Sequence, residues 1–227
     1  MSPDWGHMPD KKSDAHSIVL VDDHPIMRQG LRVLIETRPQ FRVIGEASTA
    51  SAGLEMIISK SPDLAIVDLS LPDRGGLELI KDIRAASPET ITLVLSMHEE
   101  SYYVDRVLKA GARGYVMKQE ASDKLLLAIE KVLNGEIAIS PAMSSRLIAI
   151  FSGALPDKNP NPVHLLTDRE MEVFLKLGEG LAIRQIADAL NISTKTAEVH
   201  RSNIKSKLGF SKSSEVVHYA IRWIEKN

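Results

Sequence analysis

The sequence predicts two domains of different class, a doubly wound α/β domain followed by an all-α domain. Three observations predict this division. Five short, β-branched apolar runs alternate with helix-length segments up to residue 134, residues 153–162 hold three prolines and a glycine among polar residues, and only helical patterns occur from Leu166 onward. A chain of 227 residues is long enough to build two cores.

The apolar runs are typical of strands buried on both faces of a parallel sheet. They are Ile18–Val21, Phe41–Ile44, Leu64–Val67, Ile91–Leu95 and Gly114–Met117. The segments between and after them predict helices near 25–38, 49–60, 76–86, 99–110 and 122–134. Pro25 suits a first helical turn, and Asn134-Gly135 suits a helix end. Strict alternation implies right-handed crossovers, with helices on both sides of the sheet.

The composition excludes several classes of protein. The chain has no cysteine, which rules out disulfides and thiolate metal sites and fits a reducing cytoplasm, where we expect the protein. The longest apolar runs, such as Leu147–Phe151, are too short to cross a bilayer, and the N-terminus lacks the apolar segment of a signal peptide. Residues 1–16 are polar and predict a disordered tail, in which Gly6-His7-Met8 is typical of a cloning scar.

The net charge of −2 is unevenly distributed along the chain. Residues 163–227 carry ten Lys or Arg against eight Asp or Glu, and residues 195–212 alone carry five basic residues against one acidic residue. The remainder of the chain is acidic. This asymmetry indicates that the second domain is the part that meets nucleic acid, although a short basic run is also typical of a solvated helix face.

Polar residues follow four of the predicted strands at their carboxyl ends, where open α/β sheets build their sites. The set comprises Asp22, Asp23, Asp68, Ser96 and Lys118. Three clustered carboxylates either raise a pKa or recruit a hard cation, and oxygen ligands with vacant positions suit Mg²⁺. A carboxylate can also attack phosphorus, and a metal ion, a lysine and a hydroxyl group would then neutralise the phosphoryl charge. The sequence therefore predicts a phosphoryl-transfer site.

A simpler interpretation is that these side chains cap helices. Asp23 or His24 would cap the helix that begins at Pro25, and Ser96 would cap the helix after the fourth strand. Each cap is reasonable by itself. Five suitable residues at the ends of four different strands favour a shared site instead.

The residues of this site resemble those of the receiver domain of two-component response regulators, and the resemblance covers residues 17 to about 135. The resemblance rests on Asp22-Asp23, Asp68-Leu-Ser-Leu-Pro72 with Gly76, Ser96, and Tyr115-Val-Met-Lys118. It implies a flavodoxin-like (βα)5 fold. Two departures are mild: Leu71 stands where methionine is usual, and Gln119 stands where proline often follows the lysine.

The receiver resemblance also implies a role for each residue of the pocket. Asp68 would accept phosphate from a histidine kinase. Asp23, Asp68 and the Ser70 backbone carbonyl would hold Mg²⁺, with Asp22 acting through water. Lys118 would contact the phosphoryl group, and Ser96 with Tyr115 would report its presence.

The C-terminal residues predict a helix-turn-helix arrangement. Thr167 and Glu170 have the spacing of a capping box at the start of one helix. A second, short helix is predicted over Ile183–Leu190, Asn191 suits the turn that follows, and Ser193 suits the cap of a third helix ending near Leu208. Helix, tight turn and helix is the layout of many DNA-binding domains.

The third predicted helix has two different faces. At about 100° per residue, Ala197, His200, Ile204 and Leu208 share a core face, while Lys195, Glu198, Val199, Ser202 and Ser206 share the opposite face. A lysine in the first turn opposes the helix dipole, and nearby DNA phosphate would explain it. The residues predicted to contact DNA are Lys195, Thr196, Glu198, Val199, Arg201, Ser202, Lys205 and Lys207. Glu198 would accept from a cytosine amino group, and Val199 would touch a thymine methyl group.

Residues 164–227 resemble the LuxR/FixJ/NarL type of DNA-binding domain. The resemblance rests on Leu166-Thr-Asp-Arg-Glu170, Gln185-Ile-Ala187, Ile192-Ser-Thr-Lys-Thr196, Val199-His200 and Lys207-Leu208. Ala182-Ile183 and Ala197-Glu198 depart from the common spelling, so the target DNA sequence is not implied. The last helix, about Ser213–Glu225, is expected either to pack on its own domain or, as the resemblance implies, to pair two subunits through Val216, Val217, Ala220 and Ile221.

These observations predict a phosphorylation-dependent transcriptional regulator of a bacterial two-component system rather than a turnover enzyme. Its expected partners are a histidine kinase, double-stranded promoter DNA and, on activation, a second copy of itself, with no membrane. The predicted parts are a tail at 1–16, the receiver at 17–136, a helix (Ser140–Phe151) and Pro-rich linker at 137–163, and the DNA-binding domain at 164–227.

Two other functions are weighed against this one. A metal-dependent aspartyl-phosphate phosphatase would place a second aspartate where Ser70 stands. A constitutive DNA-binding protein would not need a complete pocket. We further expect the unphosphorylated receiver to hold the DNA-binding domain through the surface formed by its fourth and fifth strands.

Overall fold

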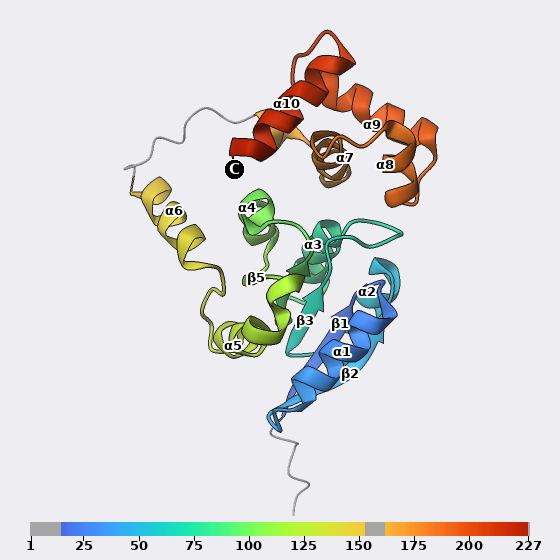
Figure 1. The fold of residues 1–227 in the computed structure, drawn as a ribbon. Coiled ribbons are helices and arrows are strands. Elements are labelled where there is room, and N and C mark those ends of the chain that lie inside the picture. Colours follow the sequence, from blue (N-terminus) through green and yellow to red (C-terminus); the bar gives the residue numbers. More distant parts are fainter. Residues whose placement is uncertain (1–14, 153–161, 227) are drawn as a thin grey trace, which may run out of the picture.

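The computed structural model describes residues 15–152 and 162–226, so the predicted tail up to residue 14 and most of the predicted linker lie outside the described part. Its first domain is a five-stranded, wholly parallel sheet in the order β2-β1-β3-β4-β5. The strands are β1 (His16–Val21), β2 (Phe41–Ala47), β3 (Leu64–Val67), β4 (Ile91–Ser96) and β5 (Gly114–Met117). The predicted doubly wound fold is confirmed (Figure 1).

Helices cover both faces of the sheet because alternate strand residues point to opposite sides. The helices are α1 (Pro25–Glu36), α2 (Ala50–Lys60), α3 (Gly76–Ala86), α4 (Glu100–Ala110) and α5 (Ala121–Leu133), with the short η1 (Lys118–Glu120) before α5. Ile18 and Leu20 of β1 pack with α1 and α5, whereas Val19 and Val21 pack with α2, α3 and α4. The predicted stop of α5 is confirmed, since Gly135 adopts φ 83° just beyond its end.

After α5 the chain turns back along the edge of β5 before it leaves the domain. Ala138 exchanges backbone hydrogen bonds with Arg113 and Tyr115, so the linker begins as a short edge pairing. Helix α6 (Pro141–Phe151) then follows, close to the predicted bounds, and projects to one side of the receiver domain (Figure 1). Within the described residues, no helix is long and apolar enough to cross a membrane.

The second domain contains α7 (Asp168–Gly178), α8 (Ile183–Ala189), α9 (Thr194–Lys207) and α10 (Ser213–Lys226), preceded by η2 (Pro162–Leu165). The predicted caps are confirmed. Thr167 and Glu170 form both hydrogen bonds of a capping box, and Ser193 Oγ accepts from the Thr196 amide at 3.0 Å. Asn191 adopts φ 51° in the turn between α8 and α9.

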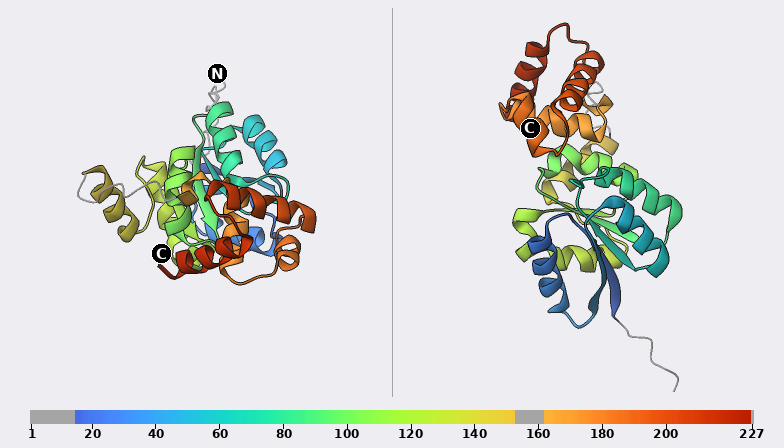
Figure 2. Two further views of the ribbon diagram at one scale, coloured as in Figure 1. Left: turned by 90° about the horizontal axis from the view of Figure 1, so that it is seen from above. Right: turned by 90° about the vertical axis from the view of Figure 1, so that its right-hand side faces the viewer.

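The two domains touch at the α3–α4 end of the receiver, with α7 and α10 facing it (Figures 1 and 2). The Arg106 guanidinium donates to the Leu166 and Val163 carbonyl oxygens at 2.8 and 2.7 Å and lies 3.3 Å from the Asp168 carboxylate. The Tyr102 ring lies 4.7 Å from that of Trp223. One apolar cluster therefore runs through both domains.

Candidate functional site

The predicted acidic pocket forms at the carboxyl ends of β1 and β3. Asp22 and Asp68 are each 2% exposed and Lys118 is 5% exposed. The Lys118 Nζ atom lies 2.6 Å from Asp22 Oδ2 and 2.7 Å from Asp68 Oδ2. Buried charges of this kind are tolerated only when they compensate one another. The structure thus brings together three residues that are far apart in the sequence.

The lysine of this pocket is held in its charged form. Burial alone would lower the pKa of Lys118, but the charges and hydrogen bonds of Asp68 and Asp22 outweigh burial, and the pKa is raised above its ordinary value of 10.5. The ammonium group is therefore a fixed positive charge beside Asp68. A negatively charged group attached to Asp68 would find this charge already in place.

The helix-cap interpretation of these residues is wrong. His24 is the N-cap residue of α1, yet within the described residues its side chain makes no capping hydrogen bond, and the N-cap residue of α4 is Glu99 rather than Ser96. Asp22 Oδ1 accepts instead from the His24 amide at 2.8 Å. The carboxylates remain available for another purpose.

The acidic residues are arranged so that one cation can contact several of them. Asp22, Asp23, His24 and Asp68 each offer a ligand atom, and these atoms lie within 4.8 Å of one another. Asp23 is partly exposed, so the cluster opens to solvent on one side. Carboxylate oxygens with access to water are the donor set that Mg²⁺ prefers. The residues present therefore fit this ion.

Gly76 is needed because the start of α3 approaches the backbone of Asp68. A Cβ atom at position 76 would lie 2.0 Å from the Asp68 carbonyl oxygen. Ser70 lies in the loop between Asp68 and Gly76, and its amide donates to Asp68 Oδ1 at 3.1 Å. The loop that follows the acidic pocket is thus folded tightly against it.

Ser96 and Tyr115 are both tied to His98 in the loop after β4. The His98 amide donates to Ser96 Oγ at 3.2 Å, and the Tyr115 hydroxyl donates to the His98 carbonyl oxygen at 2.8 Å. The His98 ring nitrogen Nε2 lies 3.3 Å from Ser70 Oγ. Burial, with the positive charges of Lys176 and Lys118, lowers the pKa of His98 to about 4, so its ring is neutral at physiological pH.

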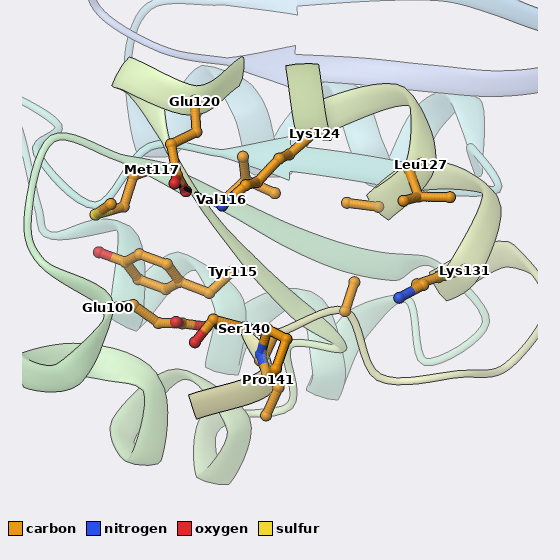
Figure 3. Close-up of a pocket in the computed structure, with 13 residues that line it drawn as sticks. Glu100, Tyr115, Val116, Met117, Glu120, Lys124, Leu127, Lys131, Ser140 and Pro141 are labelled. Atoms are coloured by element: carbon orange, nitrogen blue, oxygen red, sulfur yellow. Dashed lines mark hydrogen bonds and ion pairs between the residues drawn. The ribbon is translucent and has the colours of Figure 1, made fainter. Parts of the chain in front are cut away.

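A groove of about 260 Å³ lies beside Tyr115, between β5, α5 and the returning linker (Figure 3). Val116, Leu127 and Pro141 give it apolar walls, while Lys124 and Glu120, paired at 2.5 Å, line its polar rim. Tyr115 itself is 4% exposed. The aromatic residue predicted to report phosphorylation therefore borders open space on one side.

Helix α9 presents the face predicted to read DNA. Lys195, Glu198, Val199 and Ser202 are exposed, and Val199 is 51% exposed. Arg201 and Lys205 flank this face and are partly exposed. Ala197, Ile204 and Leu208 on the opposite side are buried, as expected, and His200 is partly buried with them.

Two of the residues predicted to contact DNA already have partners within the domain. Lys207 Nζ lies 2.7 Å from the Glu170 carboxylate of the α7 capping box, and the Thr196 hydroxyl lies 2.8 Å from the hydroxyl group of Ser193. Lys207 thereby ties the last turn of α9 to the first turn of α7. A contact from Lys207 to DNA phosphate would compete with this ion pair.

The expectation that Val216 and Ala220 pair two subunits is wrong for this conformation. Both side chains are fully buried and belong to the core that α10 forms with α7 and α9. Val217 and Ile221 are only partly buried. The apolar side of α10 therefore packs mainly in the domain core. Of the four residues expected to pair two subunits, Val217 and Ile221 are accessible to a second copy.

The fold and this pocket define a response regulator, a receiver domain joined to a helix-turn-helix DNA-binding domain. Residues 18–130 match the response regulator receiver domain family, and residues 164–220 match the luxR family of bacterial regulatory proteins. The chain belongs to the response regulators that carry a LuxR-type DNA-binding domain, and it is a transcriptional regulator rather than a turnover enzyme.

The relatives of the chain match both domains together. The transcriptional regulatory protein DegU of Brevibacillus brevis is 30% identical over 92% of this chain and 94% of its own. The structure of RcsB from Salmonella enterica serovar Typhimurium, bound to promoter rprA with the phosphomimetic BeF3-, is 29% identical over 91% of this chain and 98% of its own, with a TM-score of 0.60. A structure of two RcsB dimers bound to two parallel DNAs is 27% identical over 90% and 97%, with a TM-score of 0.55.

Sequence reasoning missed three residues at and near the site. His98 follows a strand end that was singled out, yet only the structure shows that it joins Ser96, Tyr115 and Ser70. Arg106 makes contacts that exist only because the second domain packs on α4, and the ring of Tyr103 stacks on His98 in the same region. The placement of His98 two residues after Ser96 was an available signal, whereas nothing local marks the other two.

Proposed function

We propose that Asp68 accepts a phosphoryl group from a histidine kinase and that this event controls binding of promoter DNA by α9. The observation that carries the proposal is the buried contact of Lys118 with Asp68 and Asp22 beside an open acidic cluster. An Asp68 carboxylate oxygen attacks the phosphorus, the bond between phosphorus and the kinase nitrogen breaks, and an acyl phosphate forms. Hydrolysis of that acyl phosphate by water later returns the carboxylate, so the step is self-limiting rather than a turnover reaction.

The side chains of the pocket support this chemistry by their charge and position. Lys118 supplies a fixed ammonium group for the transferred phosphoryl oxygens, and the Ser96 hydroxyl lies at the end of the neighbouring strand. Asp22, Asp23 and Asp68, with the Ser70 carbonyl, would hold Mg²⁺, which when bound neutralises phosphoryl charge. Tyr115 would change position when Ser96 turns toward the phosphoryl group.

For the DNA-binding domain we propose that Thr196, Glu198, Val199 and Ser202 read base edges and that Lys195 contacts a phosphate. Arg201, Lys205 and Lys207 would contact phosphates. The exposure of the reading face supports this assignment. Pairing of two copies on DNA would use Val217 and Ile221 of α10, and the RcsB dimers on DNA make such pairing reasonable.

The test is labelling by acetyl phosphate in the presence of Mg²⁺, followed by measurement of DNA binding. Asp68→Asn should abolish both labelling and the gain in DNA affinity, and chelation of Mg²⁺ should do the same to the parent protein. Asp123→Asn removes the same charge from an exposed position of the receiver and should leave both unchanged. Equal labelling of Asp68→Asn and the parent would contradict the proposal. Labelling without any change in DNA binding would instead favour a constitutive DNA-binding protein.

A further inference from the structure

A hydroxyl group close to the domain interface is buried, and no described residue gives it a hydrogen bond. Tyr103 of α4 is 2% exposed, and among the described residues its hydroxyl oxygen neither donates nor accepts a hydrogen bond. Its neighbour Tyr102 also faces the second domain, where its ring lies against Trp223, but it is only partly buried. Two tyrosines on one turn of α4 thus meet the same interface in different ways.

The surroundings of Tyr103 offer it packing without a polar contact. Its ring stacks on His98 at a centroid distance of 4.9 Å and belongs to the apolar cluster that includes Phe174 of α7. Burial first, and then the nearby carboxylate of Glu172, raise the pKa of Tyr103 well above its ordinary value, so the phenol stays protonated. Glu172 is itself engaged with Arg169 at 2.5 Å.

A buried hydroxyl group without a partner destabilises the state that buries it, because water would satisfy the same group after exposure. The charges of Glu172 and Asp168 on α7 act on this hydroxyl group, so it lies close to the second domain. Separation of the domains would return the hydroxyl group of Tyr103 to water, while the Arg106 contacts that oppose separation would be lost. In the closed arrangement the two domains touch, as in this structure, and in the open arrangement they are separated. The buried hydroxyl group of Tyr103 therefore affects the balance between these two arrangements.

We propose that the Tyr103 hydroxyl group weakens the contact between the receiver and the DNA-binding domain, so that the closed arrangement opens readily. Tyr103→Phe would keep the ring and its stacking on His98 while it removes the uncompensated group. The closed arrangement should then become about tenfold more favoured over the open one, which is the usual size of a penalty for one buried, unpaired hydroxyl group. The proposal concerns the interface and stands whether or not phosphate is the natural trigger.

The experiment measures the two arrangements in single molecules of the full chain. Because the chain has no cysteine, Ser59→Cys on α2 and Ser206→Cys on α9, both exposed, allow specific attachment of a fluorophore pair. Tyr103→Phe should lengthen the dwell time in the closed arrangement about tenfold. Tyr102→Phe removes a hydroxyl group from the same interface and should change the dwell time less than twofold.

Two further variants, Arg106→Gln and Asp68→Asn, are controls for this measurement. Arg106→Gln removes the donors to Leu166 and Val163 and should shorten the closed dwell time. An unchanged or shorter closed dwell time in Tyr103→Phe, with an unchanged unfolding temperature, would overturn the proposal, and so would an Arg106→Gln variant that behaves like the parent. Addition of beryllofluoride tests the proposed function separately, since loss of its effect in Asp68→Asn is independent of position 103.

Discussion

The phosphorylation pocket and the recognition helix carry charge in opposite ways. In the pocket, Asp22, Asp68 and Lys118 are at most 5% exposed, and the Lys118 ammonium group lies within 2.7 Å of both carboxylates. On α9, Lys195 and Glu198 are exposed, and the face they share is covered by no other part of the described chain. The charged groups of the pocket have their partners within the protein. Those of the exposed α9 face gain partners only when a charged molecule such as DNA binds.

This difference determines how each region responds to substitution. A buried charge that loses its partner is costly, because neither water nor another side chain replaces the lost contact. An exposed charge is solvated in both the folded and the unfolded state. Its removal therefore changes binding and leaves the free energy of unfolding nearly unchanged. Substitutions in the pocket should therefore affect the folded state as well as function, and substitutions on the exposed face of α9 should affect function alone.

The largest effect is expected for Lys118→Met, which keeps most of the side-chain volume and removes the charge. Asp22 and Asp68 would then face each other without a cation, and the free energy of unfolding should fall by about 3 kcal/mol. Millimolar Mg²⁺ should restore part of the loss by replacing the ammonium charge. Urea unfolding with and without Mg²⁺ measures both effects. A loss below about 0.5 kcal/mol, the size expected for Lys205→Ala, would show that the pocket is no more sensitive than the surface.

A smaller effect, of about 1–3 kcal/mol at one base pair, is expected for Glu198→Ala. Loss of the carboxylate should relax the preference for one base pair and leave the remaining positions of the site unchanged. Binding of a library of DNA sites by the phosphorylated protein measures this. Equal change of affinity for every sequence would mean that Glu198 does not lie on the reading face.

Lys205→Ala should weaken binding to all DNA sequences alike. The logarithm of affinity should fall less steeply with the logarithm of salt concentration, by about one counterion. The matched variant Lys207→Ala should lower the salt dependence less, because Lys207 is engaged with Glu170. Fluorescence anisotropy over a range of salt concentrations distinguishes the two, and identical slopes would show that the ion pair does not persist on DNA.

The smallest effect is expected at Asp73, an exposed carboxylate that nevertheless has partners. It accepts from the amides of Ala50 and Ser51 at 2.9 Å each, and although partial burial opposes them, these hydrogen bonds lower its pKa from 3.8 to about 2. A depressed pKa contributes stability above pH 3.8 that is lost as the pH falls toward 2. Asp73→Asn should cost less than about 1 kcal/mol near neutral pH, because solvent screens the site.

Thermal unfolding at pH 7 and at pH 2.5 checks the sign of this effect. The parent and Asp73→Asn should differ at pH 7, and the difference should be smaller at pH 2.5, where protonation of the carboxylate has begun. A difference that widens in acid would show that the carboxylate is not stabilised by these hydrogen bonds. Asp73 would then behave like the solvated charges of α9 rather than like those of the pocket.

Much of the fold could be predicted from the sequence because the signals are local. Buried strands of a parallel sheet are continuous apolar runs, and the caps at Thr167 and Ser193 and the turn at Asn191 depend on residues within four positions. The proximity of residues at strand ends could be predicted because the carboxyl ends of parallel strands lie at one edge of the sheet. The acidic pocket follows from that rule.

The remaining features depend on contacts between distant segments. The apolar period of α10 indicates that one face is buried but does not say by what, so both packing on its own domain and pairing of two subunits stayed open until the structure showed Val216 and Ala220 in the domain core. The receiver was also expected to hold the DNA-binding domain through the surface of its fourth and fifth strands. The contact lies instead on α4, through Tyr102 and Arg106, and α9 stays uncovered.

The first turn of α7 has a consequence for how movement is passed through the molecule. Its Asp168 carboxylate lies against Arg106 of the receiver, and two residues later its Glu170 carboxylate holds Lys207 at the end of α9. A single rigid turn of helix thus touches both the switch domain and the helix that reads DNA. We expect a tilt of α7 relative to Arg106 to be passed on to α9, because Asp168 and Glu170 lie on the same helical turn.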